Sequence, residues 1–261
     1  MAIVEVDALV LRSWRLGETS LIVSLLTAEH GQLRCVAKGA RNPRSRFGSS
    51  LMPGVRIRAV VYRNVNRDLQ LLSKTDIVRA WPALWEEPER FVALSSVVEF
   101  LDRAAYGESG EPALLELACD TLHEMSRAAL PLLEPLLRGF EVQACERLGY
   151  APELAACLEC RKPLRGGGLF HPVRGGLLCG APCGQDGGGF RISERARLTL
   201  VGLLTQPMAA LGGWAAERYP GAEVGRAVER FLAAHLERFE GLRAARVGES
   251  LARYDGGSSR R

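Results

Sequence analysis

The sequence of 261 residues has no apolar run near the roughly 18 residues that a bilayer-spanning helix needs. Acidic Glu5 and Asp7 stand near its start, where a secretory signal would carry lysine or arginine. Only four histidines occur, scattered along the chain, so there is little material for acid–base catalysis. We therefore expect a soluble, cytoplasmic protein that does not act at a membrane.

Signatures of nucleotide hydrolysis and of hydrolytic catalysis are also missing. None of the three lysines follows a glycine, which excludes the Walker A loop that binds nucleotide phosphates. His123-Glu124 lacks the second histidine of the HExxH motif, and the stretch 107–111 breaks the GxSxG pattern at its last position. The sequence offers no catalytic constellation, and we expect a protein that is not an enzyme.

Acidic side chains are absent between Glu29 and Asp68, an interval that holds nine basic ones. Residues 1–80 carry 13 basic and 6 acidic side chains, whereas residues 81–261 carry 21 and 24. The net charge of +4 therefore conceals a basic N-terminal part. Hydrophobic residues make up 47% of the chain and the mean hydropathy is +0.00, which suffices for one or two cores and excludes a largely disordered chain.

Short apolar runs separated by turn residues follow one another through the first eighty residues. We expect five strands, at Ile3–Trp14, Ser20–Thr27, Gln32–Lys38, Val55–Tyr62 and Leu69–Lys74. A five-stranded chain of this size most economically closes as a small barrel, and the OB-fold is the commonest such barrel. Residues 1–80 are therefore predicted to form an OB-fold domain, a fold that binds oligonucleotides through its open face and loops.

Alternation along two of these strands predicts where the charges lie. In the strand that begins at Val55, every second residue is apolar, which places Arg56 and Arg58 together on the other face. The preceding strand follows the same rule, with Arg34 and Lys38 outward. Both strands thus show a basic stripe on the surface of the barrel.

The connection between these strands carries alternating arginines, Arg41, Arg44 and Arg46, among two glycines and a proline. Like charges this dense repel one another unless an anion neutralises them, and a polyphosphate backbone supplies negative charge at regular intervals. The alternative is a solvated, mobile loop with ordinary surface charges. The absence of acidic residues from the whole interval favours the polyanion.

Three aromatic side chains of the barrel, Trp14, Phe47 and Tyr62, could offer stacking surfaces for unpaired bases. Because so small a barrel needs most of its aromatic residues inside, we expect each of them in the core.

From Trp81 onward the apolar period changes to that of helices, so residues 81–250 are predicted to form an α-helical domain. The first helix begins at Pro88, and later ones are expected over Leu115–Met125, Leu133–Leu148, from Ser193 as N-cap, and over Val224–Leu236. Gly149 is placed to end the third. Residues 251–261 are expected to be a flexible tail. The fold class is therefore α+β.

Four cysteines form a cluster within an insert at residues 154–186. Cys157-x-x-Cys160 is followed after 18 residues by Cys179-x-x-x-Cys183, and the glycine-rich sequence between them predicts two short strands around a turn. Such a hairpin brings two thiolate pairs together into a tetrahedral site for structural zinc. Two disulfides are the alternative, which a reducing compartment disfavours. Four sulfur ligands would leave no open position for a catalytic water.

The other cysteines, Cys35, Cys119 and Cys145, lie within regular elements and are expected to be small buried side chains. His171 lies within the insert, but four sulfurs already complete the site. We therefore expect His171 to be a turn residue and not a ligand.

Several of these features occur together, and in the same order, in one known family. They are Gly17-Glu18-Thr19-Ser20 after the first strand, the segment Val36–Arg41, a helical part beginning near Trp81, and the four-cysteine insert. The sequence thereby resembles the RecO family of bacterial DNA repair proteins through most of its length. The most telling local motif is Lys38-Gly39-Ala40-Arg41.

The resemblance implies an OB-fold followed by a helical domain, and a role as recombination mediator in the RecF pathway. Members of the family bind single- and double-stranded DNA and anneal complementary strands. They contact the acidic C-terminal tail of the single-strand-binding protein, act with RecR to load RecA, and do not hydrolyse nucleotides. The resemblance thus also implies a cytoplasmic, nucleoid-associated protein.

The family's basic barrel face corresponds to residues that alternation and charge already single out. These are Arg34, Lys38, Arg41, Arg44, Arg46, Arg56 and Arg58. A site for the acidic tail is implied on the helical domain, where Arg127, Arg138 and Arg147 are candidates.

Two other hypotheses stay open on the residues alone. A barrel with a zinc knuckle also suits an RNA-binding accessory factor of ribosome or transcript. The third hypothesis is a metal-dependent enzyme. Two observations together would exclude it: one tightly held zinc ion on four cysteines, and no turnover of nucleic acid.

Overall fold

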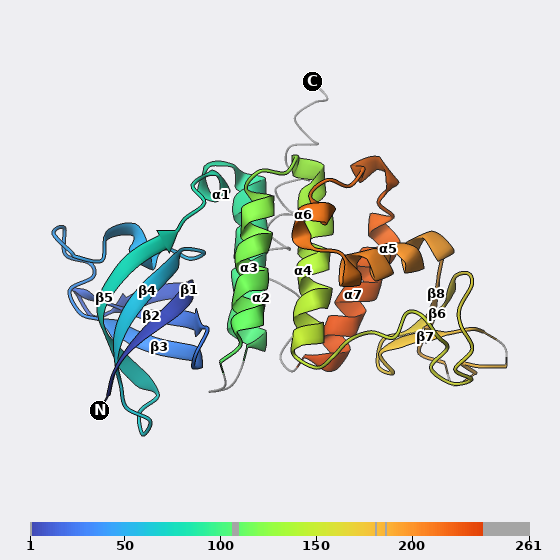
Figure 1. Ribbon diagram of the computed structural model, residues 1–261, viewed down its shortest axis with the longest axis horizontal. Coiled ribbons are helices and arrows are strands. Elements are labelled where there is room, and N and C mark those ends of the chain that lie inside the picture. Colours follow the sequence, from blue (N-terminus) through green and yellow to red (C-terminus); the bar gives the residue numbers. More distant parts are fainter. Residues whose placement is uncertain (1, 106–109, 181, 186, 237–261) are drawn as a thin grey trace.

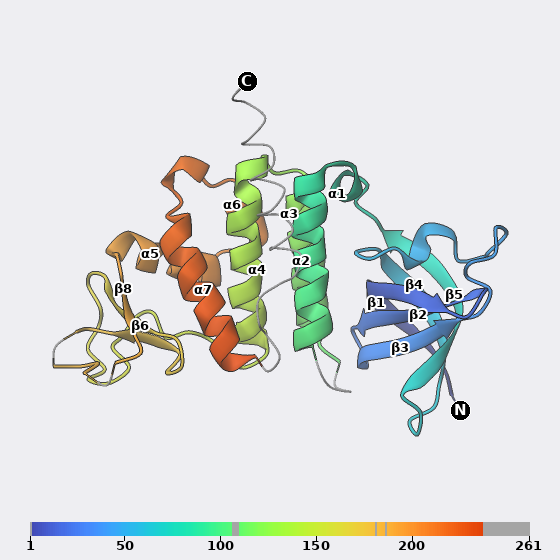
Figure 2. The ribbon, with the colours of Figure 1, turned by 180° about the vertical axis from the view of Figure 1, so that it is seen from behind.

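The computed structural model describes residues 2–105, 110–180, 182–185 and 187–236. A β-barrel lies at one end of the molecule, a group of helices in the middle and a small sheet at the other end (Figure 1). Figure 2 shows the same order from behind, with the helices between the barrel and the small sheet. The arrangement in space thus follows the order along the chain.

The barrel strands are β1 (Ala2–Leu16), β2 (Ser20–Thr27), β3 (Gly31–Ala37), β4 (Arg56–Arg63) and β5 (Leu69–Arg79). They close in the order β1-β2-β3-β5-β4, with β3 and β5 parallel and the other pairs antiparallel. This confirms the predicted OB-like barrel and its five strands. β5 runs past the expected end at Lys74, because it stays paired with β4 as far as Arg56.

Alternation along the strands fills the barrel as the sequence predicts. The inward residues of β3 and β4 are Leu33, Cys35, Ala37, Ile57, Ala59 and Val61, all buried. Arg34 and Arg58, which stand between them, are exposed. The interior is completed from the long connection after β3, where Phe47 and Leu51 are buried among these side chains.

The described helices are α1 (Ala83–Glu86), α2 (Pro88–Ala104), α3 (Pro112–Met125), α4 (Leu133–Arg147), α5 (Glu194–Thr205), α6 (Met208–Leu211) and α7 (Gly221–His235). Short 3₁₀ turns lie at Gly48–Leu51, Leu130–Leu132 and Ala216–Arg218. Gly149 follows α4 with φ of 88°, and the Ser193 hydroxyl accepts a hydrogen bond from the Ala196 N–H, which confirms both predicted helix boundaries. The sequence does not predict α1 and α6, because one turn is too short to show a period.

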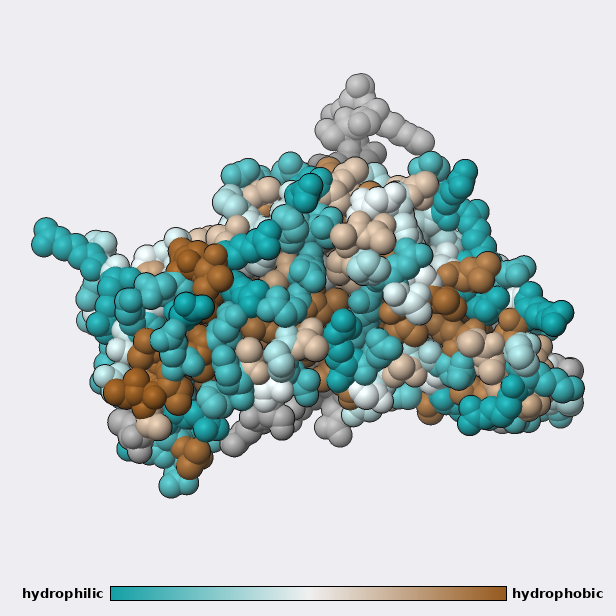
Figure 3. Space-filling model, in the orientation of Figure 1, coloured by the Kyte–Doolittle hydropathy of each residue, from teal (hydrophilic) through white to brown (hydrophobic). Residues whose placement is uncertain are grey.

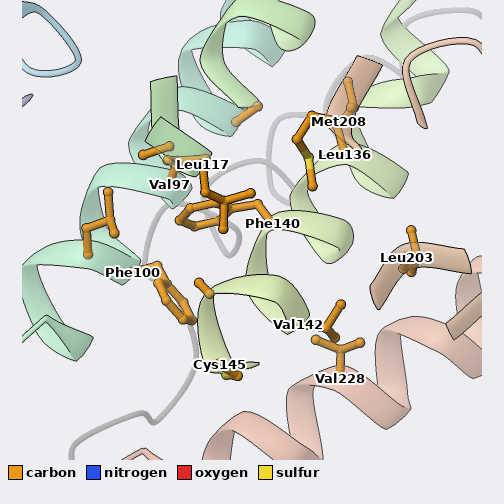
Figure 4. Packing of buried hydrophobic residues seen from close by; sticks show 14 of the residues in the cluster. Val97, Phe100, Leu117, Leu136, Phe140, Val142, Cys145, Leu203, Met208 and Val228 are labelled. Atoms are coloured by element: carbon orange, nitrogen blue, oxygen red, sulfur yellow. The ribbon is translucent and has the colours of Figure 1, made fainter. Parts of the chain in front are cut away.

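The core of the helical part is built around α4. Phe100 of α2 and Phe140 of α4 meet edge to face with ring centroids 5.3 Å apart, and Leu117 of α3 packs beside them (Figure 4). On the other side of α4, Val142 faces Val228 of α7 (Figure 4). Full burial of each such side chain contributes about 1.5 to 3 kcal/mol, so this core holds the helices in fixed positions.

The barrel and the helices share a closely packed contact. Leu9 and Leu26 point out of the barrel and belong to the helical core. Asp102 of α2 accepts hydrogen bonds from Ser24 Oγ at 2.7 Å and from Gln32 Nε2 at 2.8 Å. A Cβ added at Gly110 would lie 2.2 Å from the carbonyl oxygen of Ala28, so only glycine fits there. One side of the barrel is therefore covered by helices.

The small sheet has the order β7-β6-β8, with β6 (Gly168–His171), β7 (Gly176–Leu178) and β8 (Phe190–Ile192). The predicted hairpin is confirmed as β6 and β7, whereas β8 is not predicted. Phe170, Leu177 and Ile192 join the helical core and so anchor the sheet. The expected tail at 251–261 lies outside the described residues.

Candidate nucleic-acid interface and metal site

Strand β3 presents a cation, an apolar side chain and a second cation in succession on the outside of the barrel. Arg34 and the following Lys38 are exposed, and Val36 between them is half-buried. Within the described part of the chain, no carboxylate lies within ion-pair distance of either cation. The predicted basic stripe on this strand therefore carries charge that none of the described residues neutralises.

The arginine-rich connection after β3 is held against the β1–β2 turn. The Arg41 guanidinium donates to the carbonyl oxygens of Gly17 at 3.1 Å and Glu18 at 2.6 Å. Arg46 lies over the ring of Phe47, 5.4 Å from its centroid, and Arg44 is exposed. Because carbonyl groups and a ring leave the positive charge in place, the three arginines add to the cationic surface that begins at Lys38.

Arg56 occupies a different environment from the other candidates. Its guanidinium binds the Asp7 carboxylate in a bidentate pair and also the Glu116 carboxylate of α3, and its side chain is 17% exposed. The hydrogen bonds that the Arg56 guanidinium donates to these two carboxylates raise its pKa. Arg56 points outward, as predicted. Its charge is neutralised there, because the guanidinium bridges Asp7 of the barrel and Glu116 of α3. Arg58 pairs only loosely with Glu5, at 3.4 Å between exposed side chains.

The three aromatic residues divide between the inside and the outside of the barrel. Phe47 is in the core as expected, at 3% exposed. The same expectation was wrong for Trp14 and Tyr62, which are half-buried on the outer face and belong to neither described core. Arg12, which the charge interval does not include, lies over the Trp14 ring at 5.6 Å. The bulge after Val10 shifts the alternation of inward and outward residues along β1, so the outward position of Arg12 is hard to predict from the sequence.

The four cysteines of the insert converge as their spacing predicts. The sulfurs of Cys157, Cys160, Cys179 and Cys183 all lie within 4.8 Å of one another, and those of Cys160 and Cys179 are 3.8 Å apart. All four cysteines are free, so the disulfide alternative is not observed. A tetrahedral ion with sulfur ligands at about 2.3 Å separates neighbouring sulfurs by about 3.8 Å. The donor set therefore fits one such metal ion.

Local backbone geometry shapes this cluster. Arg161 adopts a left-handed conformation with φ of 59°, which turns the chain after the first cysteine pair. Glu159 joins the two knuckles, because its carboxylate accepts from the Gly184 N–H at 3.2 Å and pairs with Arg174 at 3.3 Å. His171, expected to be a turn residue, is instead the buried last residue of β6, and its Nδ1 accepts from the N–H of Arg174 in the turn that follows.

The thiols of the chain differ in how readily they ionise. Burial opposes ionisation of Cys157, but N–H groups of Cys160, Glu159 and Cys179 stabilise its thiolate and lower its pKa to about 6. Burial raises the pKa of the three isolated cysteines to about 12, so they stay protonated, in line with the predicted structural role. The isolated cysteines are Cys35, Cys119 and Cys145.

Comparison with known proteins agrees with both parts of this architecture. Residues 1–81 match the family model "Recombination protein O N terminal", and residues 86–244 match "Recombination protein O C terminal". The chain belongs to the RecO family. It is 33% identical over 249 residues to a "DNA repair protein RecO" of Symbiobacterium thermophilum, covering 91% of this chain and 94% of the relative. A relative with the same name from Anaeromyxobacter dehalogenans is 32% identical, with 93% of each chain covered.

The three arginines expected to bind an acidic tail could do so only where they are accessible. Arg138 is not, because its guanidinium is largely buried between the carboxylates of Glu141 and Glu229. Arg147 donates to the carbonyl oxygen of Gln143, and Arg127 contacts His123. The structure thus assigns Arg138 to the helical core, contrary to the expectation.

A groove on the helical part combines charged and apolar side chains. It lies along α5 and the segment before α7, and its lining includes two arginines, one glutamate and large apolar side chains: Glu194, Arg195, Leu198, Trp214, Arg218 and Tyr219. The Trp214 indole N–H donates to Gln206, and the Arg195 guanidinium donates to the carbonyl oxygen of Arg218. None of the described helices is long and apolar enough to span a bilayer.

Proposed function

We propose that this RecO-family protein is a DNA-binding recombination mediator that acts in DNA repair without catalysing a reaction. The observation that supports this most directly is the row of outward cations without carboxylate partners on β3 and the loop that follows it. The DNA-binding residues in this proposal are Arg34, Lys38, Arg41, Arg44 and Arg46, with Arg58 at the edge. Arg56 is left out, since Asp7 and Glu116 already neutralise it.

Binding of this kind follows from the charge alone. Phosphate contacts release counterions and carry no sequence information, so binding is expected to tolerate any sequence and to weaken steeply with salt. Both single and double strands offer phosphates to this face. A surface that holds two strands while screening their repulsion also favours annealing of complementary strands.

Partners of the mediator follow from the proposed function. With RecR it would help to load RecA on DNA covered by the single-strand-binding protein. We infer that the acidic tail of that protein binds the groove along α5, where Arg195 and Arg218 supply positive charge beside Leu198 and Trp214. In this proposal the groove takes the place of Arg138 as the binding site, because Arg138 is paired with the buried Glu141.

Zinc is the metal that best suits four cysteine thiolates in a closed tetrahedral site. The described part of the insert forms only a small apolar cluster of its own, of Cys157, Leu178 and Cys183. Metal ligation contributes folding free energy on the order of 10 kcal/mol in small zinc modules. The proposed role of zinc is therefore to hold the two knuckles of the insert together.

Strand annealing on DNA coated with the single-strand-binding protein tests polymer, partner and activity together. We expect the protein to accelerate annealing of complementary coated strands without nucleotide. The variant Arg218→Glu should lose this acceleration on coated DNA and keep it on bare DNA. No annealing on either substrate would contradict the proposed function.

The competing function is RNA binding, which the same barrel chemistry allows. Competition between single-stranded DNA and RNA of equal length separates the two. A clear preference for RNA, together with no annealing of DNA, would favour the RNA-binding factor.

A further inference from the structure

A row of apolar and aromatic side chains crosses the outside of the barrel. The pairing register links Trp14 to Ile22, Ile22 to Val36, Val36 to Leu71 and Leu71 to Tyr62. We call these five side chains the outer strip. All five are half-buried, and none belongs to a core in the described part of the chain. The packing of the barrel therefore gives no reason for their apolar character.

The outer strip lies away from the helices. The residues of β1 and β2 that join the helical core are Leu9, Leu11 and Leu26, which precede or follow the strip along their strands. Both ribbon views show the helices on one side of the barrel only (Figures 1 and 2). Apolar surface is visible on the barrel among hydrophilic side chains (Figure 3), and Ile3, next in register to Tyr62, is 65% exposed.

Cations border the strip on both sides. On the side nearer the helices, the register places the exposed Arg12 and Arg34 on either side of Ser24, which is buried and donates to the Asp102 carboxylate. On the other side Lys38 follows β3, and the loop beyond it carries Arg41, whose N–H donates to the Thr19 carbonyl at 2.9 Å. Outward side chains two residues apart on a strand stand about 7 Å apart, so each cation row lies one such step from the strip.

We propose that the outer strip stacks the unpaired bases of single-stranded DNA while the cation rows beside it bind the phosphates. This rests on the proposed DNA-binding function and adds a basis for preferring single strands. Every base has an apolar face that an aromatic or aliphatic side chain can cover, whatever the sequence. In a duplex those faces are already stacked, so duplex DNA reaches only the cations.

Charge complementarity selects this occupant over another protein surface. A second copy of this chain placed on the strip would bring Arg34 and Lys38 of the two copies near one another, and no ion pair among the described residues neutralises either cation. A polyanion with apolar side groups meets both the cations and the strip.

The test compares oligothymidylate with a duplex of equal length. Trp14→Ala and Tyr62→Ala should each weaken oligothymidylate binding about tenfold and change duplex binding less than about twofold. Trp14→Phe should recover most of the loss, because it keeps a stacking ring. Phe91→Ala removes a half-exposed aromatic side chain from α2 and serves as the matched control, with both affinities unchanged.

A second readout uses the unaltered protein. The part of the tryptophan fluorescence that Trp14→Phe removes should be quenched by oligothymidylate and not by the duplex. Equal losses for both polymers, no loss in either variant, or no quenching would overturn the proposal. A change of oligomeric state in Trp14→Ala with unaltered DNA binding would also overturn it and assign the strip to contact between copies.

A cation variant separates this inference from the proposed function. If Lys38→Glu with Arg44→Glu weakens neither polymer, the proposed DNA-binding function itself fails. If that variant weakens both polymers while Trp14→Ala and Tyr62→Ala leave oligothymidylate binding intact, the cation surface stands and the stacking strip fails.

Discussion

Two outer faces of the same barrel differ in how their charges are compensated. On the face toward the helices, Arg56 meets two carboxylates and Asp102 accepts from Ser24 and Gln32. On the opposite face, Arg34, Lys38 and Arg44 have no carboxylate partner among the described residues. A buried or half-buried charge is costly without a partner, whereas an exposed one is stable in water and remains available to a ligand. The comparison separates the arginine that builds the fold from those that can serve binding.

Loss of the metal site is the largest expected effect and tests whether the cationic face is independent of the insert. Cys157→Ser with Cys160→Ser should remove most of the metal-dependent stability of the insert, on the order of 10 kcal/mol in isolated zinc modules. We expect a lower melting temperature and early proteolysis within the insert, with unchanged DNA affinity. Metal analysis of the parent provides the control. Normal melting of the variant and no metal in the parent would contradict the assignment.

Arg56→Ala sharpens the comparison directly. It leaves Asp7 and Glu116 without their shared cation at the contact between barrel and helices, so we expect about 2 kcal/mol less stability in chemical denaturation. Arg58→Ala is the matched control on the same strand. Its pair with Glu5 is 62% exposed on both sides, so its loss should cost about 0.3 kcal/mol. Similar losses for both variants would show that Arg56 is not a structural residue.

Close approach of the backbones is tested at Gly110. An added methyl group would lie 2.2 Å from the Ala28 carbonyl oxygen, so Gly110→Ala should destabilise the contact by about 1 to 2 kcal/mol. Gly166→Ala is the control, since nothing lies within 4 Å of its added Cβ. Equal melting temperatures for the two variants would contradict the packing described for the contact.

The smallest effect lies far from both faces, at the start of α5. Ser193→Ala removes the helix cap and one hydrogen bond to Glu223, for an expected loss of about 1 kcal/mol at neutral pH. Hydrogen bonds from Ser193 lower the pKa of Glu223, so this stabilisation is present above the ordinary pKa of glutamate. It disappears as the pH falls through the lowered value. Denaturation at pH 7 and pH 3 should therefore show a smaller difference from the parent at the lower pH.

Much of the fold could be predicted because its signals are local. Alternation identified the strands and their inward residues, and spacing identified the four cysteines, since both depend only on neighbouring positions. The partners of Arg56 could not be predicted, because Glu116 lies on a helix sixty residues away and only the packing of α3 on the barrel brings it close. Likewise, the outer strip needs the register of five strands, which alternation within one strand does not supply.

The salt dependence of DNA binding tests the central claim most directly. Binding of oligothymidylate should weaken linearly on logarithmic axes as salt rises, with a slope of about 0.7 per phosphate contact. Charge reversal at Arg41, Arg44 and Arg46 should lower the affinity and flatten this slope by about 2, since each lost contact removes one such increment. Reversal of the exposed Arg191 on β8 should leave the slope as in the parent. An unchanged slope and affinity in the triple variant would contradict DNA binding by this face of the barrel.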